Sequence, residues 1–508
     1  MGLSEGDRNP QVARLTGGHA KTKRGPLTYC VLTLILFLFV WAVPAWAAPF
    51  VLVDGKPLES KVPPAIEQGR VLVPARAISQ VLGALLEWDG ATRTVTITRE
   101  QVTVRIAIGA RAAYRNGVPV ALDVPARIVN GRALVPLRFV SESLGAGVFW
   151  DGQTATVLTG TPEVSGVPEE RELFPVRVDG ALGYIDGTGK IVIKPQFSNG
   201  CAFSEGLARV WIGRKQGYID KAGRVVIGPQ FDGAEDFSEG LAAVQLSSGG
   251  KWGYIDRAGR LVISPQFDSA GPFREGLARV QVGTGGEWGY IQKWGYIDRS
   301  GKAVIPAQFE YAWDFSEGLA RIELTRADGY YRSGYIDTTG RFVIQPDFEL
   351  AEDFSGGFAV VRFGQSSLAP MVCEQWGYID RTGTVVIGPG FKLAEPFREG
   401  LAAVLVASPG NPSGKWVYID RTGRVVIDRD DIIVPGDFSE GLAPVKVGCG
   451  SGNLWGYIDK NGNMVIGPRF ESAGGFHSGL AEVGVDLVHG GRWGYIDNTG
   501  KYVWYPSK

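Results

Sequence analysis

Repeated carboxylates are the first side chains of this chain whose type and spacing could do chemistry. Examples are Asp186, Asp220 and Asp256 at one position of a repeated motif, and Glu205, Glu239 and Glu275 at another. A catalytic pair needs two distinct environments that separate the pKa values of its carboxyls. Acidic residues that recur in every copy of a motif more often have a structural role than a catalytic one. A calcium site is also not expected, because one Asp per turn supplies too few oxygen ligands. We therefore expect no catalytic residue and no metal site among them.

Histidine and cysteine offer few candidates for a nucleophilic centre. His477 replaces Ser in a repeated F-S-E-G element, so we expect an exposed turn residue, and His489 lies in a Gly-rich loop. No G-x-S-x-G elbow, P-loop or H-E-x-x-H motif occurs. The three cysteines after residue 47 do not have the close spacing, such as C-x-x-C, that is typical of metal ligands. They are Cys201, Cys373 and Cys449. The chain is therefore expected to be no enzyme and to carry no cofactor.

Aromatic side chains remain as candidates for ligand contact. A W-G-Y motif recurs along the chain, and alternation places its Trp and Tyr on the same face of a strand. A soluble protein rarely exposes so long an aromatic row, so these rings are expected in the core rather than on a sugar-stacking ladder. Aromatic residues in variable loops outside the consensus are better ligand candidates. These are Trp288, Tyr290, Tyr330 and Tyr331.

The motif belongs to nine copies of a short repeat that fill residues 173–508. The marker G-Y-I-D starts at Gly183, Gly217, Gly253, Gly295, Gly334, Gly377, Gly456 and Gly494, with Val417 in place of Gly in the seventh copy. Another Gly follows the marker start after six residues in every copy, which predicts a hairpin with an I-D-x-x-G turn capped by the Asp. A Pro-x-Phe element and F-S-E-G-L-A then follow at nearly constant spacing. The interval to the next marker varies, which indicates solvent loops.

Each copy reads as three strands, which we expect to stack on their neighbours because one unit cannot bury its aromatics alone. Propeller blades usually have four strands. We therefore slightly favour an open, solenoid-like stack over a propeller-like ring. The seventh copy departs from the pattern, with Arg429, Asp430 and Asp431 where Pro-x-Phe is expected, and its packing there is left open.

Residues 48–160 form a second, duplicated unit. Residues 69–98 match residues 131–160 at an offset of 62, which pairs LVPxR, LG and W-D-G of one half with those of the other. Each half predicts a hairpin at Asp54-Gly55 or Asn116-Gly117, a strand, a short helix that ends at Gly83 or its counterpart, and a hairpin at W-D-G. The expected fold is thus mainly β, with a small α+β module before the repeat array.

Both units resemble known families. Residues 50–160 resemble the copper amine oxidase N-terminal-like domain, and residues 173–508 resemble the WG (KWG) repeat family of bacterial surface and secreted proteins. In the oxidase, copper and the quinone cofactor belong to a separate domain that needs three His ligands and an Asn-Tyr motif. His19 lies in the leader, the rest of the chain has two His, and no Asn-Tyr dipeptide occurs. Copper amine oxidase activity is therefore excluded, because the chain has too few His residues for the copper site and no Asn-Tyr motif.

The first residues predict export. A basic region is followed by an apolar run, Leu27 to Val43, and by Ala45-Trp46-Ala47, which is typical of a signal peptide over residues 1–47 with cleavage after Ala47. An uncleaved anchor is the alternative, and it would be the chain's one contact with a membrane. Residues 161–172, rich in Pro, Glu and Ser, read as a linker. The net charge of −1 argues against nucleic acid as a partner.

These features favour a secreted or cell-envelope, non-catalytic binding or scaffold protein. Its repeat array would present variable loops to a cell-wall component such as peptidoglycan, to another polysaccharide, or to a protein ligand. Two alternatives stay open: a secreted carbohydrate-active enzyme with an unrecognised carboxylate pair, and a mechanical spacer. Two loop acids about 5–10 Å apart would favour the enzyme.

Overall fold

The computed structural model describes residues 49–150, 154–159, 171–286, 289–327, 329–364, 376–408, 411–449, 452–486 and 491–507. The leader, its predicted cleavage position at Ala47, most of the predicted linker, Trp288, Cys373 and His489 lie outside these residues. The protein is mainly β, as predicted, with 63% of its residues in strands and 3% in helices. Neither of the two helices in the described part has the length and apolar character needed to span a membrane.

The N-terminal module is built twice from the same elements. The first half contains β1 (Phe50–Val53), β2 (Lys56–Pro57), β3 (Ala65–Glu67), β4 (Arg70–Pro74), α2 (Ala75–Val81), β5 (Leu85–Asp89) and β6 (Thr94–Arg99). After β7 (Val102–Ala107), the second half contains β8 (Ala112–Arg115), β9 (Val118–Ala121), β10 (Arg127–Val129), β11 (Arg132–Pro136), α3 (Leu137–Ser143), β12 (Gly147–Trp150) and β13 (Thr154–Leu158). The helices α2 and α3 lie 62 residues apart at both ends, so the sequence duplication is a structural one.

The two halves meet at an internal two-fold axis. Strands β4 and β11 pair antiparallel, with Val73 opposite Val135, its own counterpart in the other half. They form the centre of a sheet in the order β10-β11-β4-β3, flanked by the sheets β12-β13-β1-β2 and β5-β6-β7-β8-β9. Because β1 of the first half pairs with β13 of the second half, neither half is a separate folding unit.

The turns of the module form as predicted. Asp54 and Gly55 both have positive φ in the two-residue turn between β1 and β2, and Asn116 and Gly117 repeat this between β8 and β9. Both are the tight hairpins that Asx-Gly favours. The first helix ends before Gly83, whose φ of 65° is the left-handed conformation expected at that position.

The repeat array consists of nine small sheets among the described residues, here called blades 1 to 9. Blade 1 is β14 (Leu173–Val178), β15 (Ala181–Asp186) and β16 (Ile191–Phe197). Blades 2 to 5 are β17 (Asn199–Gly200), β18 (Leu207–Ile212), β19 (Lys215–Asp220) and β20 (Val225–Phe231); β21 (Gly233–Ala234), β22 (Leu241–Gln245), β23 (Trp252–Asp256) and β24 (Leu261–Phe267); β25 (Ser269–Arg274), β26 (Leu277–Gly286), β27 (Gly289–Ile297) and β28 (Ala303–Phe309); and β29 (Tyr311–Ser316), β30 (Leu319–Thr325), β31 (Tyr331–Asp337) and β32 (Phe342–Phe348).

Blades 6 to 9 repeat the same order of strands. They are β33 (Leu350–Ala351), β34 (Phe358–Arg362), β35 (Trp376–Asp380) and β36 (Val385–Phe391); β37 (Leu393–Ala394), β38 (Leu401–Ser408), β39 (Asn411–Asp420) and β40 (Val425–Asp428); β41 (Ile432–Pro435), β42 (Leu442–Cys449), β43 (Gly452–Asp459) and β44 (Met464–Phe470); and β45 (Ser472–Ala473), β46 (Leu480–Val485), β47 (Arg492–Asp497) and β48 (Tyr502–Ser507).

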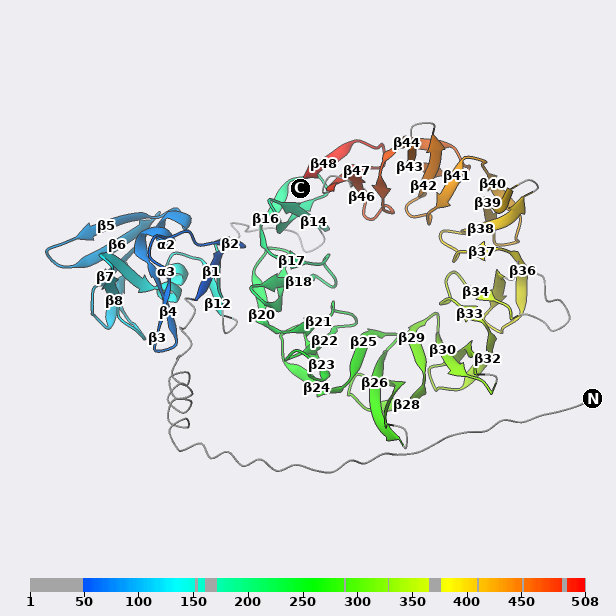
Figure 1. Ribbon diagram of the computed structural model, residues 1–508, viewed down its shortest axis with the longest axis horizontal. Coiled ribbons are helices and arrows are strands. Elements are labelled where there is room, and N and C mark those ends of the chain that lie inside the picture. The colour runs from blue at the N-terminus through cyan, green and yellow to red at the C-terminus, as the bar shows by residue number, and fades with distance from the viewer. Residues whose placement is uncertain are drawn as a thin grey trace, which may run out of the picture. The chain divides into compact units, whose positions relative to one another are not determined.

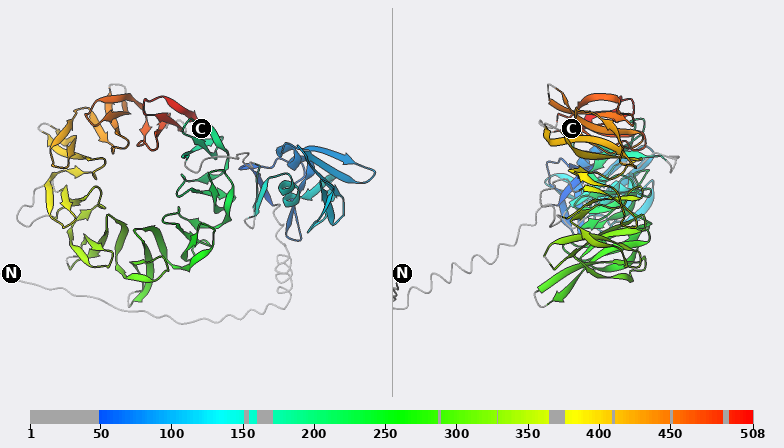
Figure 2. Two further views of the ribbon diagram at one scale, coloured as in Figure 1. Left: turned by 180° about the vertical axis from the view of Figure 1, so that it is seen from behind. Right: turned by 90° about the vertical axis from the view of Figure 1, so that its right-hand side faces the viewer.

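Two predictions about the array are wrong. Blades 2 to 9 have four strands rather than three, because a short first strand, often of two residues, pairs with the L-A-x-V strand. The array is also a closed ring rather than an open stack: Figures 1 and 2 show the blades side by side around a common centre, with blade 1 next to blade 9. The short strands lie on the inner side of the ring and the last strands on the outer side (Figure 1).

The marker tyrosine links each blade to the next. Its ring is buried in every copy, and its hydroxyl donates a hydrogen bond to a backbone carbonyl of the following blade, as from Tyr218 to Glu235 at 2.6 Å. In blades 1 to 8 the same ring packs against the Phe of F-S-E-G in the next blade, for example Tyr254 against Phe273 at 5.0 Å between centroids. The Tyr and the Phe are therefore the two sides of one inter-blade contact.

Blade 1 closes the ring with the same contact made from a different residue. Among the described residues it has no short first strand, and the sequence before β14 contains no F-S-E-G element. Phe174 stands where the other blades have Ala, and its ring lies 5.5 Å from that of Tyr495 in blade 9. The Tyr495 hydroxyl donates to the Pro175 carbonyl at 3.0 Å, as the other tyrosines donate to their neighbours.

The Ser and Glu side chains of F-S-E-G form hydrogen bonds between neighbouring blades. The Ser hydroxyl donates to the Phe carbonyl of the next blade, as from Ser238 to Phe273 at 2.6 Å. The Glu carboxylate accepts from a backbone N–H of the next blade's turn, as Glu205 does from Gly240 at 2.9 Å. The repeated Glu is thus structural, as its recurrence predicts.

The repeated Asp caps the hairpin turn in all nine copies, also as predicted. In each turn Oδ1 accepts from the backbone N–H groups two and four residues later, as Asp380 does from Thr382 and Thr384. The Gly that follows has positive φ in every copy, as Gly383 does. Hydrogen bonds from the Thr382 hydroxyl and from these N–H groups hold the pKa of Asp380 below its ordinary value.

The turn aspartates should make the ring sensitive to acid. A carboxyl whose pKa is lower in the folded than in the unfolded chain stabilises the fold above its unfolded pKa, and this stability is lost as the pH falls through the folded pKa. We expect Asp380→Asn to lower the thermal unfolding midpoint near neutral pH, and the difference from the wild type to shrink between about pH 5 and about pH 2. A difference that stays constant over this range would show that the carboxylate charge contributes nothing.

Candidate functional site

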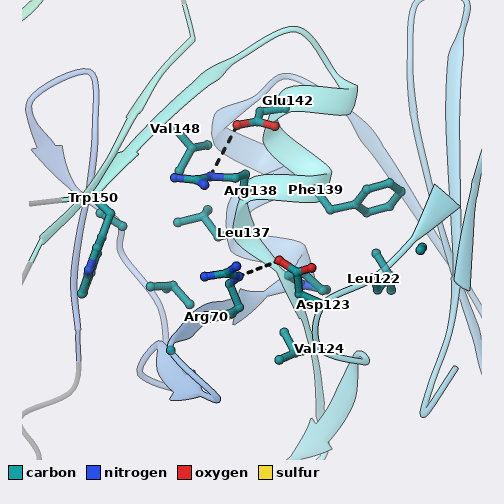
Figure 3. Close-up of a pocket in the computed structure, with 15 residues that line it drawn as sticks. Arg70, Leu122, Asp123, Val124, Leu137, Arg138, Phe139, Glu142, Val148 and Trp150 are labelled. Carbon is teal, nitrogen blue, oxygen red and sulfur yellow. Dashed lines mark hydrogen bonds and ion pairs between the residues drawn. The ribbon is translucent and has the colours of Figure 1, made fainter. Parts of the chain in front are cut away.

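The structure places two concave sites in the N-terminal module. The first, the Trp150 cleft, has a volume of about 260 Å³ and is lined by residues of β11, α3 and β12 and by the β3–β4 hairpin (Figure 3). The second, the Trp88 cleft, has a volume of about 390 Å³ and is lined by residues of β4, α2 and β5 and by the β10–β11 hairpin. Cavities of this order hold small ligands.

The two clefts are made from equivalent residues. Trp88 and Trp150 are counterparts at the offset of 62, and they keep 45% and 36% of their surface exposed. Each stands beside the arginine of its own LVPxR motif, Arg76 or Arg138, and beside an arginine from the other half, Arg132 or Arg70 respectively. The two-fold axis between β4 and β11 brings these segments together.

Local structure explains why these side chains face outward. The strand residues of LVPxR are buried, so β4 and β11 end in the core, and the helix starts at the following residue. The arginine is the second residue of the helix and is exposed in both halves. The tryptophan lies near or at the end of the next strand, where Trp88 pairs with Val95 and Trp150 with Ala155. LVPxR and W-D-G therefore form opposite walls of one cleft.

Ion pairs neutralise the arginines of the Trp150 cleft. Arg70 lies 2.6 Å from Asp123, and Arg138 lies 3.5 Å from Glu142 one helical turn later. Figure 3 shows both pairs between Trp150 on one side and Phe139 and Leu122 on the other. The cleft thus offers an aromatic face beside hydrogen-bonding groups of both signs, an arrangement suited to a neutral polar ligand.

The ligand candidates predicted from the variable loops are only partly described. Trp288 lies outside the described residues, and Tyr290 belongs to β27 with a side chain outside them as well. Tyr330 lies just before β31 and Tyr331 is the first residue of that strand in blade 5, with 67% and 47% of their surface exposed. Their role as ligand contacts stays a prediction.

Tyr331 is joined by aromatic residues that the sequence did not single out. Its ring lies 5.3 Å from that of Tyr311, which lies 6.3 Å from Trp313 on the same strand, β29. Arg321 stacks on Trp313 at 3.7 Å. Asn, Gly, Ser or Leu stands at the position of Tyr311 in most other copies, so an aromatic at that position was the available signal.

Of the two histidines considered above as candidates for a nucleophilic centre, His477 lies in the described residues. The His477 side chain is 78% exposed, and its one charged neighbour among the described residues is Glu172 at 3.8 Å. Within the described ranges no three His, Cys, Asp or Glu side chains are grouped so as to hold a metal ion. The marker tyrosines are core residues, whereas the tryptophan before them is partly exposed, as Trp493 is at 44%.

Comparison with protein families identifies the repeat. A family model described as a WG containing repeat matches eight segments: 183–215, 217–251, 252–288, 294–325, 334–365, 376–407, 416–448 and 455–486. Together they make up more than half of the chain. The chain belongs to the WG-repeat family. In this WG-repeat protein a second model, the copper amine oxidase N-terminal domain, matches residues 52–159, which carry both clefts.

Comparison with solved structures yields distant likenesses. The apo form of AztD from Citrobacter koseri is 13% identical, with a TM-score of 0.31 over 58% of this chain and 93% of that one. The β-propeller domain of the Trilobed protease from Pyrococcus furiosus is 9% identical, with a TM-score of 0.31 over 58% of this chain and 97% of that one. These likenesses are too distant to indicate a shared function. A comparison with curated protein sequences finds no match.

Proposed function

We propose that this WG-repeat protein is an exported, non-catalytic binding protein of the cell envelope. Its N-terminal module binds a saccharide in the two clefts, and its ring serves as a rigid scaffold. The ligand would be a cell-wall glycan or another polysaccharide. The observation that carries this proposal is the pair of equivalent clefts, each with a partly exposed tryptophan beside two arginines.

Side-chain chemistry favours a saccharide in these clefts. A tryptophan ring offers a flat apolar face on which the C–H face of a sugar ring can stack, while its N–H remains available as a donor. Guanidinium groups present several donors in a fixed geometry, which suits sugar hydroxyl and carboxylate oxygens. Two such clefts on one module match a ligand made of repeated units, because binding at one cleft raises the effective concentration at the other.

The ring has the features of a scaffold. The Ser, Glu and Tyr of the repeat bond to the next blade, and the Asp bonds to its own turn, so these consensus groups are committed to structure. Sequence variation is concentrated in the hairpins between the second and third strands. In blade 4 the sequence W-G-Y-I occurs twice, at residues 288–291 and 294–297, and this hairpin is longer, with strand pairing out to Gly286 and Gly289. Such loops can vary in contact surface without altering the ring.

Removing the cleft tryptophans tests the proposal. We expect Trp88→Ala and Trp150→Ala each to weaken binding of the purified protein to isolated cell walls or to oligosaccharides of a glycan array by about tenfold, because each removes the stacking face of one cleft. The double variant should bind least. Trp493→Ala is the matched control, since Trp493 is exposed to the same degree on the ring and should leave binding unchanged.

The same assay separates the alternatives. A wild-type protein that binds no wall fraction and no oligosaccharide would overturn the proposal and favour a mechanical spacer. Shortening of the bound oligosaccharide over time would overturn the non-catalytic assignment and favour a carbohydrate-active enzyme. Equal loss of binding in Trp493→Ala would move the binding surface from the module to the ring.

A further inference from the structure

The two clefts of the module differ in charge although they are built alike. Among the residues that line the Trp150 cleft, Arg70 and Arg138 are balanced by Asp123 and Glu142. The lining of the Trp88 cleft contains two arginines, Arg76 and Arg132, and no acid. The duplication has therefore produced one neutral and one cationic site.

The sequence shows how this difference arose within the repeat of 62 residues. The counterpart of Asp123 in the first half is Lys61, and the counterpart of Glu142 is Gln80. Both acids that neutralise the Trp150 cleft are thus replaced at the matching positions by a cationic and a neutral residue. These two replacements act in the same direction, removing negative charge at the matching positions, while the arginines and the tryptophan of the cleft are retained.

The arginines of the Trp88 cleft are available to a ligand. Arg76 and Arg132 are both exposed, and neither makes an ion pair or a side-chain hydrogen bond within the described part of the chain. A guanidinium group binds carboxylate or phosphate oxygens through two parallel N–H donors, and such charge-assisted bonds are stronger than bonds to neutral groups. A sugar ring stacked on Trp88 would have the guanidinium groups of Arg76 and Arg132 at its edge.

We propose that the Trp88 cleft binds an anionic sugar residue and the Trp150 cleft a neutral one, so that the module recognises an acidic polysaccharide in which charged and neutral residues both occur. This inference rests on the proposed saccharide-binding function and adds its ligand class. The negative charge is a carboxylate or a phosphate group, both of which the arginine pair can hold.

The test compares two anionic ligands with a neutral one, which differs from the first of them in charge alone. The probes are an oligogalacturonate, the same oligosaccharide with every carboxyl methyl-esterified, and a poly(glycerol phosphate) chain, with the full protein throughout. We expect the wild type to bind at least one anionic probe about tenfold more tightly than the neutral ester. The probe that binds identifies the charge as carboxylate or phosphate.

Matched variants locate the preference. Arg76→Gln with Arg132→Gln should abolish it, whereas Arg70→Gln with Arg138→Gln, at the equivalent positions of the other cleft, should retain it. Grafting the missing acids with Lys61→Asp and Gln80→Glu should reduce the preference without removing an arginine. Thermal unfolding of each variant shows that it is folded.

The outcomes separate this inference from the proposed function. A preference for anionic probes that survives Arg76→Gln with Arg132→Gln, or that is lost equally in the other pair, overturns the inference. Trp88-dependent saccharide binding with no charge preference overturns the inference alone and leaves the proposed function standing. Absence of binding to any saccharide overturns both.

Discussion

Replacing Phe174 by alanine is expected to open the ring between blades 1 and 9. Phe174 is buried in a cluster with Val176, Ile185, Leu480 and Tyr495, which spans this boundary. Loss of a buried Phe side chain costs about 3–5 kcal/mol. At this boundary no chain connection holds the two blades together, and no strand of blade 1 pairs with a strand of blade 9 in the described residues. The lost packing therefore falls on the contact that closes the ring.

Phe315→Ala is the matched control for ring opening. Phe315 packs on Tyr296 at 5.0 Å across the boundary of blades 4 and 5, so the variant loses an equivalent contact. There the chain passes directly from one blade to the next, and the blades stay adjacent. Small-angle X-ray scattering should show a larger radius of gyration for Phe174→Ala alone. Hydrogen exchange should show faster exchange in β15 and β47.

Unchanged dimensions and protection in Phe174→Ala would show that other contacts close the ring. The Tyr495 hydroxyl bond to Pro175 and the approach of Gly189 to the backbone of Val503 would then be among the remaining candidates. Combining Phe174→Ala with Tyr495→Phe would distinguish between them.

The closed ring shows which parts of this fold a single sequence can and cannot predict. Turns such as that at Asp380 were predictable because the Asp cap and the positive-φ Gly are local requirements that recur at fixed spacing. The fourth strand was not, because two residues such as Asn199 and Gly200 carry no periodic pattern. Phe174 did carry a signal, an aromatic where eight other copies have Ala, but its meaning depends on the missing Phe of blade 1.

The clefts could not be predicted from the sequence for a different reason. Trp88 and Arg76 belong to one half of the module and Arg132 to the other, and they meet because β4 pairs with β11 across the two-fold axis. Recurrence made LVPxR and W-D-G look like structural markers of the duplication. The charge difference between the halves is visible in the sequence at Asp123 and Lys61. It can be interpreted only once the structure shows that the two halves form equivalent clefts.

The marker glycine lies opposite a β-bulge in the last strand of its blade, and we expect its replacement to reduce the stability of the ring strongly. In blade 2, Gln216 pairs with Phe231 and Tyr218 with Ile227, so Gly217 faces a strand with extra residues that include Pro229. A Cβ on Gly217 would lie 2.5 Å from the Ile227 carbonyl oxygen. The bulge accommodates a proline that cannot donate to the ladder, and it brings the two backbones close together.

The seventh copy shows that the glycine and the proline depend on each other. There Val417 pairs with Asp428 and Tyr418 with Ile427 in regular register, and Pro-x-Phe is absent. With no bulge opposite, a β-branched residue fits and is buried. The two departures of this copy, which look unrelated in the sequence, therefore have one structural cause.

We accordingly expect Gly217→Ala to destabilise the ring by about 3 kcal/mol, because the new methyl group must push two backbones apart. Gly228→Ala is the control in the same hairpin: a Cβ there meets no atom within 4 Å, and its cost should stay within about 0.5 kcal/mol. Chemical denaturation of the two variants compares their free energies of unfolding. Equal stability would mean that the bulge yields readily to a side chain, and the shared absence of the glycine and the proline in the seventh copy would then need another explanation.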